Sequence, residues 1–222
     1  MDFSNKQASI FYIERSHAFY YDKSLSSPLK IEFPEDVFAN SEVIDRKKFN
    51  VLIQDFIVKN KINPNKIIYI VLSSQITFEK DFAKKTVISE TELQELLSLI
   101  PFEEIINKEY QLGNKIKIVS LNKHLCNIMR NVFEENKFIV GGVVPFAVVK
   151  EVIPELGKNL NLDVLLNKTD TLRTYSLFTA EETNATISQP KKKNNINIRS
   201  IILLGILGSL IIILGTVILL RL

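Results

Sequence analysis

Cysteine and histidine, the residues that most often bind metals or act as nucleophiles, are nearly absent from this chain of 222 residues. The only cysteine is Cys126, which excludes a disulfide within the chain and any cysteine-rich metal site. The two histidines, His17 and His124, are too few and too scattered to indicate a zinc site. The sequence therefore predicts no metal and no cofactor.

These scarce residues have both a catalytic and a structural interpretation. His17 would need a partner carboxylate for catalysis, and Glu14 is near in sequence, but an exposed turn histidine is the favoured interpretation. His124 and Cys126 would act as a nucleophile pair only if they faced each other. At positions i and i+2 of a helix they point about 200° apart. We therefore predict that both pack at the edge of the helix's apolar side.

Glycine is also scarce: the chain has seven, and the first is Gly113. Gly141 and Gly142 lie inside an apolar stretch, but no helix-opening G-x-G-x-x-G pattern surrounds them, so a phosphate-binding turn is not indicated. A β-bulge or a close approach of two strands is the favoured interpretation of this pair.

A basic folded region is missing as well. The formal net charge is +3, but five of the 28 basic residues and none of the 25 acidic residues follow Pro190. The chain before Pro190 thus carries 23 basic and 25 acidic residues and a formal charge of −2. A nucleic-acid-binding protein usually has a basic face on its folded part. We therefore expect no nucleic-acid partner.

One long run contains no charge at all: IILLGILGSLIIILGTVILL, bounded by Ile201 and Leu220. A helix of about 20 apolar residues spans the hydrocarbon core of a bilayer and satisfies its own backbone groups there. A buried core helix is the alternative, but core helices rarely stay apolar on all sides for this length. The sequence predicts one C-terminal transmembrane helix over residues 200–221.

The residues that flank this run predict its orientation. Only Arg221 follows it, whereas a basic group precedes it: Lys191, Lys192, Lys193 and Arg199. Positive residues stay on the cytoplasmic side and also attract anionic headgroups. The start, MDFSNKQASIFYIERS, lacks the pattern of a secretory signal. We expect a single-pass protein with a cytoplasmic N-terminal domain and the lipid bilayer as a partner.

Small residues in the apolar run offer a face for contact between membrane helices. They are Gly205, Gly208, Ser209, Gly215 and Thr216. Glycine is also ordinary in membrane helices, so self-association through this face is one of two interpretations.

The rest of the chain has the pattern of a mixed α/β domain. Three short strands are predicted at 9–14, 18–22 and 29–34, followed by a helix over 45–59, a buried strand at 66–72 and a further strand at 76–82. Ser89 and Glu92 form a capping box for the next helix. A strand pair at 107–112 and 115–121 then turns through Gly113.

The pattern continues to Pro154 and then weakens. Asn122 is expected to cap a helix, residues 137–146 to form a strand, and Pro145 to begin a helix that ends at Val152. Beyond Pro154, one or two strands are predicted. Residues 179–199 are polar and basic, which favours a flexible linker.

Two stretches resemble a known family. Residues 49–82 resemble a helix-strand-strand passage of the type IV pilus assembly protein PilM. Residues 93–149 resemble a later passage of that family, with an "IPF" element at 100–102 and a "PFA" element at 145–147. The cytoplasmic domain of the type II secretion protein L is similar in fold, and it too precedes a single membrane helix.

The resemblance implies a ribonuclease H-like, actin-like fold that is only partly present. Residues 1–150 would be the PilM-like cytoplasmic domain, and residues 151–178 a remnant or extension of it. Actin-like ATPases carry an Asp with glycines or serines in the first hairpin, near phosphate and metal. Here YIERSHAF has Glu14 and Ser16 as candidate remnants and no glycine. We therefore expect no catalytic residues, no nucleotide and no enzymatic activity.

The predicted function is a scaffold anchored to the inner membrane, in the assembly platform of a type IV pilus or a type II secretion-like machine. Its partners would be other platform proteins, and anchoring would raise their effective concentration. Two alternatives remain: a degenerate actin-like nucleotide-binding protein, and a tail-anchored adaptor unrelated to pili. Heptads are missing before the apolar run, which argues against a SNARE.

Overall fold

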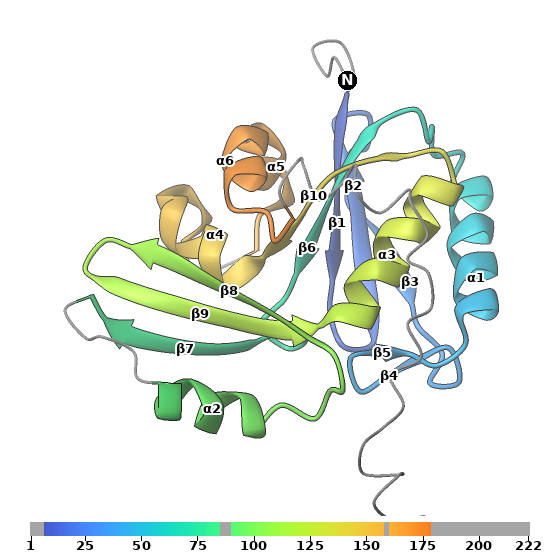
Figure 1. Ribbon diagram of the computed structural model, residues 1–222. Helices are drawn as coiled ribbons and strands as arrows, with labels where there is room; N and C mark the ends of the chain where they lie inside the picture. Colours follow the sequence, from blue (N-terminus) through green and yellow to red (C-terminus); the bar gives the residue numbers. More distant parts are fainter. Residues whose placement is uncertain (1–6, 85–89, 158–159, 179–222) are drawn as a thin grey trace, which may run out of the picture. The chain divides into compact units, whose positions relative to one another are not determined.

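The apolar residues 67–72 form the central strand, because their side chains are buried on both faces. The computed structural model describes residues 7–84, 90–157 and 160–178. In it, β6 (Ile67–Leu72) lies between β1 (Ala8–Ile13) and β10 (Ile139–Pro145), and both neighbours run parallel to it (Figure 1).

Two further strands complete this five-stranded sheet. β2 (His17–Asp22) pairs antiparallel with β1, and β3 (Leu29–Glu32) pairs antiparallel with β2. The strand order is β10-β6-β1-β2-β3. Three antiparallel strands that continue into parallel ones are the order expected for the ribonuclease H-like arrangement, and the mixed α/β class is confirmed.

Two capped helices cover one face of the sheet. Asp45 accepts hydrogen bonds from the backbone N–H groups of Lys47 and Lys48 and starts α1 (Arg46–Lys59). Asn122 caps α3 (Lys123–Glu135) in the same way. Both caps satisfy N–H groups that a helix leaves unpaired at its start. The predicted helix and the predicted cap at Asn122 are confirmed.

Short helices cover the opposite face: α4 (Phe146–Val152), the 3-10 turn η1 (Pro154–Leu156), α5 (Leu162–Asn167) and α6 (Thr169–Thr174). The prediction of strands after Pro154 was wrong. Asn161 caps α5, and Leu162, Leu165 and Leu166 follow the helical spacing and are buried. Six-residue helices are too short for apolar periodicity to distinguish them from strands.

A second, three-stranded sheet is inserted between β6 and α3, in the order β7-β9-β8. Its elements are β7 (Phe78–Ala83), α2 (Glu90–Ser98), β8 (Ile105–Leu112) and β9 (Lys115–Asn122). The turn from β8 to β9 contains Gly113 at φ +60°, a conformation that favours glycine. A small hairpin, β4 (Phe38–Ala39) and β5 (Glu42–Val43), precedes α1. The predicted capping residue Ser89 lies outside the described residues.

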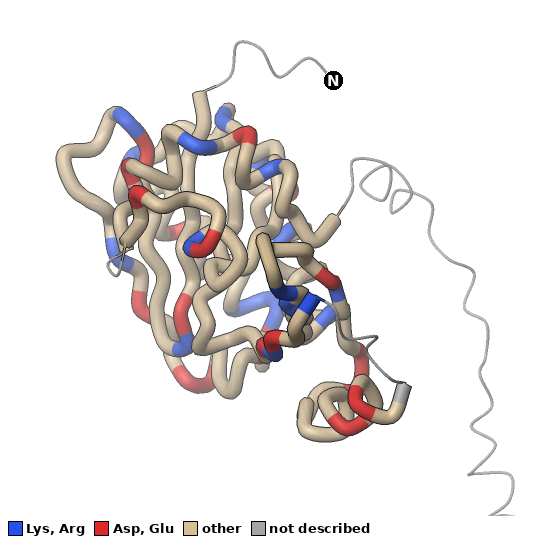
Figure 2. Tube along the Cα trace, turned by 90° about the vertical axis from the view of Figure 1, so that its left-hand side faces the viewer, with Lys and Arg blue, Asp and Glu red and all other residues tan. Residues whose placement is uncertain are grey.

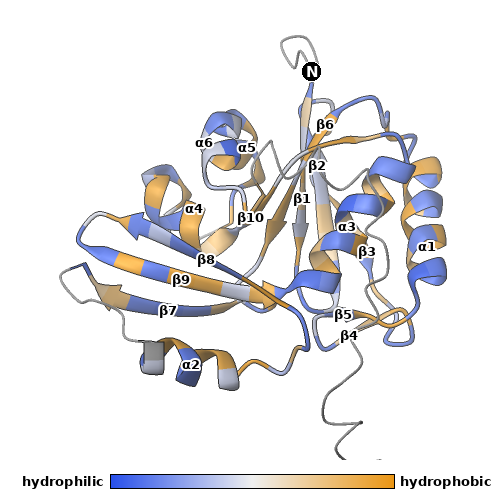
Figure 3. Cartoon of the chain, viewed as in Figure 1, coloured by the Kyte–Doolittle hydropathy of each residue, from blue (hydrophilic) through white to orange (hydrophobic). Residues whose placement is uncertain are grey.

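Alternation along the strands produces two apolar layers. In β1, Phe11 and Ile13 pack under α1 and α3, whereas Ile10 and Tyr12 pack under α4, α5 and α6. Figure 3 shows the hydrophobic residues concentrated on the central strands and on one side of α1 and α3. The larger sheet is therefore a buried middle layer.

The predicted linker at 179–199 and the predicted transmembrane helix at 200–221 lie outside the described residues. Within the described ranges, none of the helices combines the length and apolar character needed to cross a bilayer.

Candidate functional site

Two turns meet at the carboxyl ends of the parallel strands β1 and β6. This edge of an α/β sheet is where ligands usually bind. The backbone N–H of Arg15 donates to Gln75 Oε1 at 3.5 Å, and Arg15 Nη2 donates to the Gln75 carbonyl at 3.4 Å. Gln75 Nε2 in turn donates to Glu14 Oε2 at 3.4 Å. The two turns are thus joined by their own side chains and backbone.

Ser16 and His17 extend this strand-end cluster, which we define as Glu14, Arg15, Ser16, His17 and Gln75. Ser16 Oγ lies 3.2 Å from His17 Nδ1, and His17 Nε2 lies 3.3 Å from Glu14 Oε2. The partner carboxylate considered for His17 is therefore present. A serine and a carboxylate on one imidazole can exchange protons. The cavities described below lie elsewhere on the fold.

The prediction that His17 is an exposed turn residue was wrong. His17 is the first residue of β2, where it pairs with Glu32, and its side chain is 19% exposed. Its ring makes an edge contact with Phe19. The strand begins one residue earlier than expected because Phe33 N–H donates to the Ser16 carbonyl and extends the ladder.

Tyr12 lies just before the strand-end cluster and is buried. Burial raises the pKa of Tyr12 to about 12, the charge of Glu14 adds to this, and a hydrogen bond with Ser73 opposes it. The phenol therefore stays neutral at physiological pH and is no proton acceptor for the cluster.

A buried ion pair, which sequence reasoning missed, lies at the start of β6. Lys66 Nζ contacts Asp22 Oδ2 at 2.6 Å, and both side chains are less than a tenth exposed. Tyr20 and Ser24 also donate to Asp22. Burial alone would raise the pKa of Asp22, but these hydrogen bonds, above all that from Lys66, outweigh it and lower the pKa. The available signal was a carboxylate at an inward position of an apolar strand.

A second charged group joins the small sheet to α4. Lys115 and Lys117 of β9 each contact both Asp81 of β7 and Glu151 of α4, at 2.7–3.1 Å. Burial lowers the pKa of Lys117, but hydrogen bonds with the two carboxylates outweigh it and the pKa rises. All four charges are paired, so this group has the character of a structural brace.

Cys126 and His124, the two candidates on α3, differ in their exposure to solvent. Cys126 is fully buried, and burial raises the pKa of its thiol well above the ordinary value, which makes it a poor nucleophile. His124 is exposed. The prediction that both pack at the edge of the apolar side was therefore wrong, while their separation agrees with expectation.

The predicted bulge at the glycine pair is confirmed. The register between β10 and β6 shifts between Val140 and Gly142. A Cβ at Gly141 would lie 2.6 Å from Ile67 Cγ2 and 2.8 Å from Tyr69 Cζ. Position 141 thus requires glycine because β6 approaches closely.

The outer edge of β10 is covered by residues 175–178, which we call the exit segment. Leu177 N–H donates to the Val143 carbonyl at 2.8 Å, and Val143 N–H donates to Ser176 Oγ at 3.2 Å. From β8, Lys108 Nζ donates to the Ser176 carbonyl and Tyr110 Oη donates to the Tyr175 carbonyl.

Buried Arg130 of α3 lies under the end of the exit segment. Its guanidinium carbon is 5.7 Å from the centre of the Phe178 ring, which allows a cation–π contact. Its Nε is 3.4 Å from Glu134 but lacks a hydrogen bond among the described residues.

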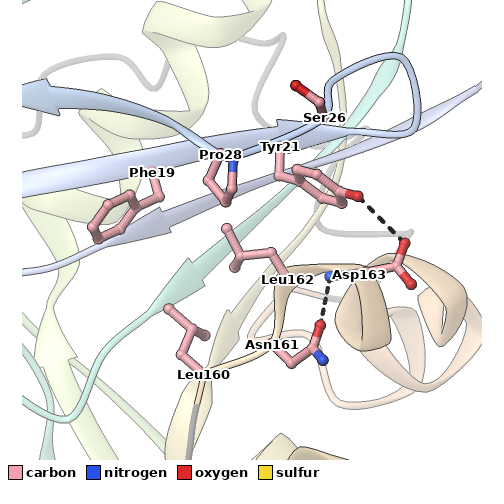
Figure 4. A pocket seen from close by; sticks show the side chains of 8 residues that line it. All are labelled: Phe19, Tyr21, Ser26, Pro28, Leu160, Asn161, Leu162 and Asp163. Atoms are coloured by element: carbon pink, nitrogen blue, oxygen red, sulfur yellow. Dashed lines mark hydrogen bonds between the residues drawn. The ribbon is translucent and has the colours of Figure 1, made fainter.

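One cavity, of about 320 Å³, lies between β2 and the start of α5 (Figure 4). Phe19 and Tyr21 form one wall, and Tyr21 Oη reaches Asp163 Oδ1 at 3.5 Å. Its other lining residues are Ser26, Pro28, Leu160, Asn161 and Leu162. Aromatic and apolar walls with one carboxylate suit a small amphipathic ligand more than a phosphate.

A larger groove, of about 620 Å³, lies between the outermost strand β3 and helix α1. We call it the edge groove, and it is lined by Lys30, Ile31, Glu32, Leu52, Asp55, Phe56, Val58, Lys59 and Asn60. Helix α1 contributes Asp55 and Lys59 to it, whereas Lys30 and Glu32 alternate with Ile31, which packs under α1, so their side chains point to the opposite face of the sheet.

The basic group before the apolar run and the five small residues within it lie outside the described residues. In the described part, no three His, Cys, Asp or Glu residues gather as a metal site would require. Acidic and basic residues are interspersed along the trace in Figure 2.

Solved structures with a similar arrangement include members of both families to which the sequence pointed. The chain is similar to the PilM-PilN type IV pilus biogenesis complex, with 12% identity, 63% of this chain and 46% of that chain covered, and a TM-score of 0.43. It is similar to cyto-EpsL, the cytoplasmic domain of an inner-membrane component of the Vibrio cholerae type II secretion system, with 7% identity, 63% and 55% covered, and a TM-score of 0.37.

A third similar structure is a Bacteroides thetaiotaomicron protein with an actin-like ATPase fold, with 12% identity, 64% and 55% covered, and a TM-score of 0.37. The chain spans about half the length of these structures. No family model and no curated protein matches the sequence.

Proposed function

We propose that this chain is a non-enzymatic scaffold, held at the cytoplasmic face of the inner membrane by a C-terminal helix, in the assembly platform of a type IV pilus or a type II secretion-like machine. The place in such a machine comes from the resemblance of residues 49–82 and 93–149 to PilM and of the organisation to the type II secretion protein L. Its partners would be other platform proteins, the lipid bilayer and further copies of the chain.

The hydrogen bonds that join the two strand-end turns are the observation that supports a non-enzymatic role. In an actin-like ATPase the first hairpin approaches phosphate and metal, and close approach of the backbone needs glycine. Here the hairpin carries Glu14, Arg15 and Ser16, and Arg15 and Glu14 are bonded to Gln75 of the neighbouring turn. A phosphate would have to break these contacts and would meet the Glu14 carboxylate.

The anchor is supported by the uncharged run of residues 201–220 and its basic flank. The test is carbonate extraction of membranes from cells that make the full chain. We expect the protein to stay in the pellet and to dissolve only in detergent, and release into the carbonate supernatant would overturn the anchor.

Nucleotide binding is the alternative that the strand-end cluster keeps open. Calorimetric titration of the full chain in detergent with Mg·ATP should give no binding heat. As a control, the variants Arg15→Ala and Gln75→Ala remove hydrogen bonds between the two turns and leave the apolar core unchanged. Saturable heat with the unaltered chain, lost in a Glu14 or Ser16 variant, would favour the degenerate actin-like enzyme instead.

The machine itself is tested by deleting the gene in a host that assembles pili or secretes through such a system. We expect assembly to fail and to return with the intact gene. Normal assembly without the gene would favour the tail-anchored adaptor.

A further inference from the structure

The edge groove borders a strand with unpaired backbone groups. Among the described residues, β3 is the last strand of the sheet order and pairs only with β2. Phe33 N–H donates toward β2, to the Ser16 carbonyl. In an antiparallel ladder alternate residues point their backbone groups to the same side, so Ile31 also faces β2. Lys30 and Glu32 therefore direct their N–H and C=O groups to the open edge.

The charges on this edge are self-complementary. The side chains of Lys30 and Glu32 point to the same face of the sheet and contact each other at 2.6 Å. If a second β3 pairs antiparallel, with a twofold axis beside Ile31, each Lys30 stands opposite Glu32 of the second copy. Both outward-facing pairs then exchange two backbone hydrogen bonds, and both are oppositely charged.

The groove beside the edge lies on the other face of the strand. The side chain of Ile31 packs under α1, so those of Lys30 and Glu32, its neighbours in β3, point to the opposite face, and Asp55 and Lys59 are the charged side chains that α1 contributes to the groove. One charge of each sign gives a segment with charges of a single sign no net attraction. Val58, which lines the groove and is 70% exposed, would be shielded from water by the second copy.

We infer that two copies of this chain pair edge to edge through β3, which joins their sheets and closes the edge groove. A four-residue strand with charged side chains is a weak association surface by itself. Confinement to a membrane would raise the effective concentration of copies. That contribution rests on the proposed anchor, whereas the register of pairing depends only on the described residues.

Directed disulfides test the register. Full-length Lys30→Cys and Glu32→Cys variants, with different tags, are expressed together and oxidised in membranes. Directly paired residues lie about 5.5 Å apart between Cα atoms, within disulfide range, whereas like positions are diagonal neighbours at about 7–8 Å. We expect a linked dimer of mixed tags in the co-expressed sample and much less in either variant alone. Glu109→Cys, exposed on β8, is the matched control.

Charge reversal separates pairing between copies from the ion pair within one copy. Lys30→Glu alone and Glu32→Lys alone place like charges opposite each other twice, and each should weaken association about tenfold. A mixture of the two variants restores both opposite pairs between copies, although neither chain regains its internal pair. Recovery of energy transfer between labelled copies in that mixture is therefore expected, with the melting temperature of each variant recorded as a folding control.

Several outcomes would overturn the pairing. One is a mixture of cysteine variants that links no better than each variant alone. Another is association of unchanged strength in both charge-reversal variants, which would indicate that the copies associate through the membrane helix. A third is a link from position 30 to a different protein, which would make the edge a heterologous docking site. Val58→Asp should also weaken pairing, whereas Leu99→Asp, an equally exposed apolar position elsewhere, should not.

Discussion

The two outer strands of the main sheet, β10 and β3, differ in whether other residues cover their outer edges. At β10 the exit segment covers the edge, and Leu177 and Ser176 bond both backbone groups of Val143. At β3 no described residue pairs with the outer edge, which lies beside a groove of about 620 Å³. A sheet that is closed on one side and open on the other can extend only in one direction, so it can form a pair but not a fibre.

Two ion pairs show the same contrast. The pairs Asp22–Lys66 and Lys30–Glu32 have the same N···O distance, 2.6 Å. Asp22 and Lys66 have side chains that are 4% and 7% exposed, whereas those of Lys30 and Glu32 are 47% and 67% exposed. Burial, not distance, decides what each contributes: removing one partner strands a charge in the first pair, and water replaces it in the second.

The largest expected effect is at the buried pair. Asp22→Ala leaves Lys66 without its carboxylate and removes the acceptor of Tyr20 and Ser24. We expect a loss of about 3–5 kcal/mol in the free energy of unfolding, measured by urea denaturation of the full chain in detergent. A loss no larger than that of Lys30→Ala would mean that burial does not distinguish the two pairs.

The pH dependence of this pair has a defined sign. The pKa of Asp22 is lower in the folded state than its ordinary value of 3.8. Its stabilisation is therefore complete above about 3.8 and is lost as the pH falls through the lower, folded value. Asp22→Asn should flatten the decline of stability in that acid range, and an unchanged acid profile would contradict the lowered pKa.

The next effect tests the close approach at the closed edge. Gly141→Val would force a side chain against Ile67 and Tyr69, where a Cβ would already lie within 2.8 Å. We expect a loss of about 1–3 kcal/mol in thermal or urea unfolding. The comparison at the open edge is Lys30→Val, which places the same side chain at a position that is 47% exposed. Equal losses would show that the two edges are equally tolerant.

A more local effect is expected at Ser176. Ser176→Ala removes the acceptor of Val143 N–H and leaves that buried group unpaired, which costs about 1–3 kcal/mol. Hydrogen exchange of the Val143 amide should accelerate more than that of amides in the middle of β6. An unchanged exchange rate would show that the exit segment does not protect this edge.

The smallest effect on folding is expected at the open edge. Lys30→Ala should change the free energy of unfolding by no more than about 0.5 kcal/mol, because the pair is exposed. The same variant should weaken pairing between copies. A large loss of folding stability together with unchanged pairing would invert the comparison between the edges.

Much of the fold was accessible from the sequence because its signals are local. The stripe of Phe49, Ile53 and Ile57 defined α1, Asn122 defined the start of α3, and the apolar run at 66–72 defined the central strand. The order of elements was enough for the mixed α/β class. The prediction for the segment after Pro154 was wrong because α5 and α6 are each six residues long, which is less than two helical turns and too short to show helical periodicity.

The contacts of the site were less accessible, because they depend on register. Glu14 and His17 were named, but Gln75 is some sixty residues away and meets them only because β1 and β6 end at the same edge. Asp22 and Lys66 lie 44 positions apart and come together through the β1–β2 and β1–β6 pairings. Neither strand pairing can be predicted from the local pattern of a single sequence.

The exit segment determines how a pull on the chain would enter the domain. Tension applied beyond Phe178 meets bonds to β10 at Val143 and to β8 at Lys108 and Tyr110 within four residues. Such a load is divided between two sheets at once instead of peeling one strand away. Residues 175–178 thus connect the inserted sheet to the main sheet through hydrogen bonds, and a pulling force on the chain would load both sheets together.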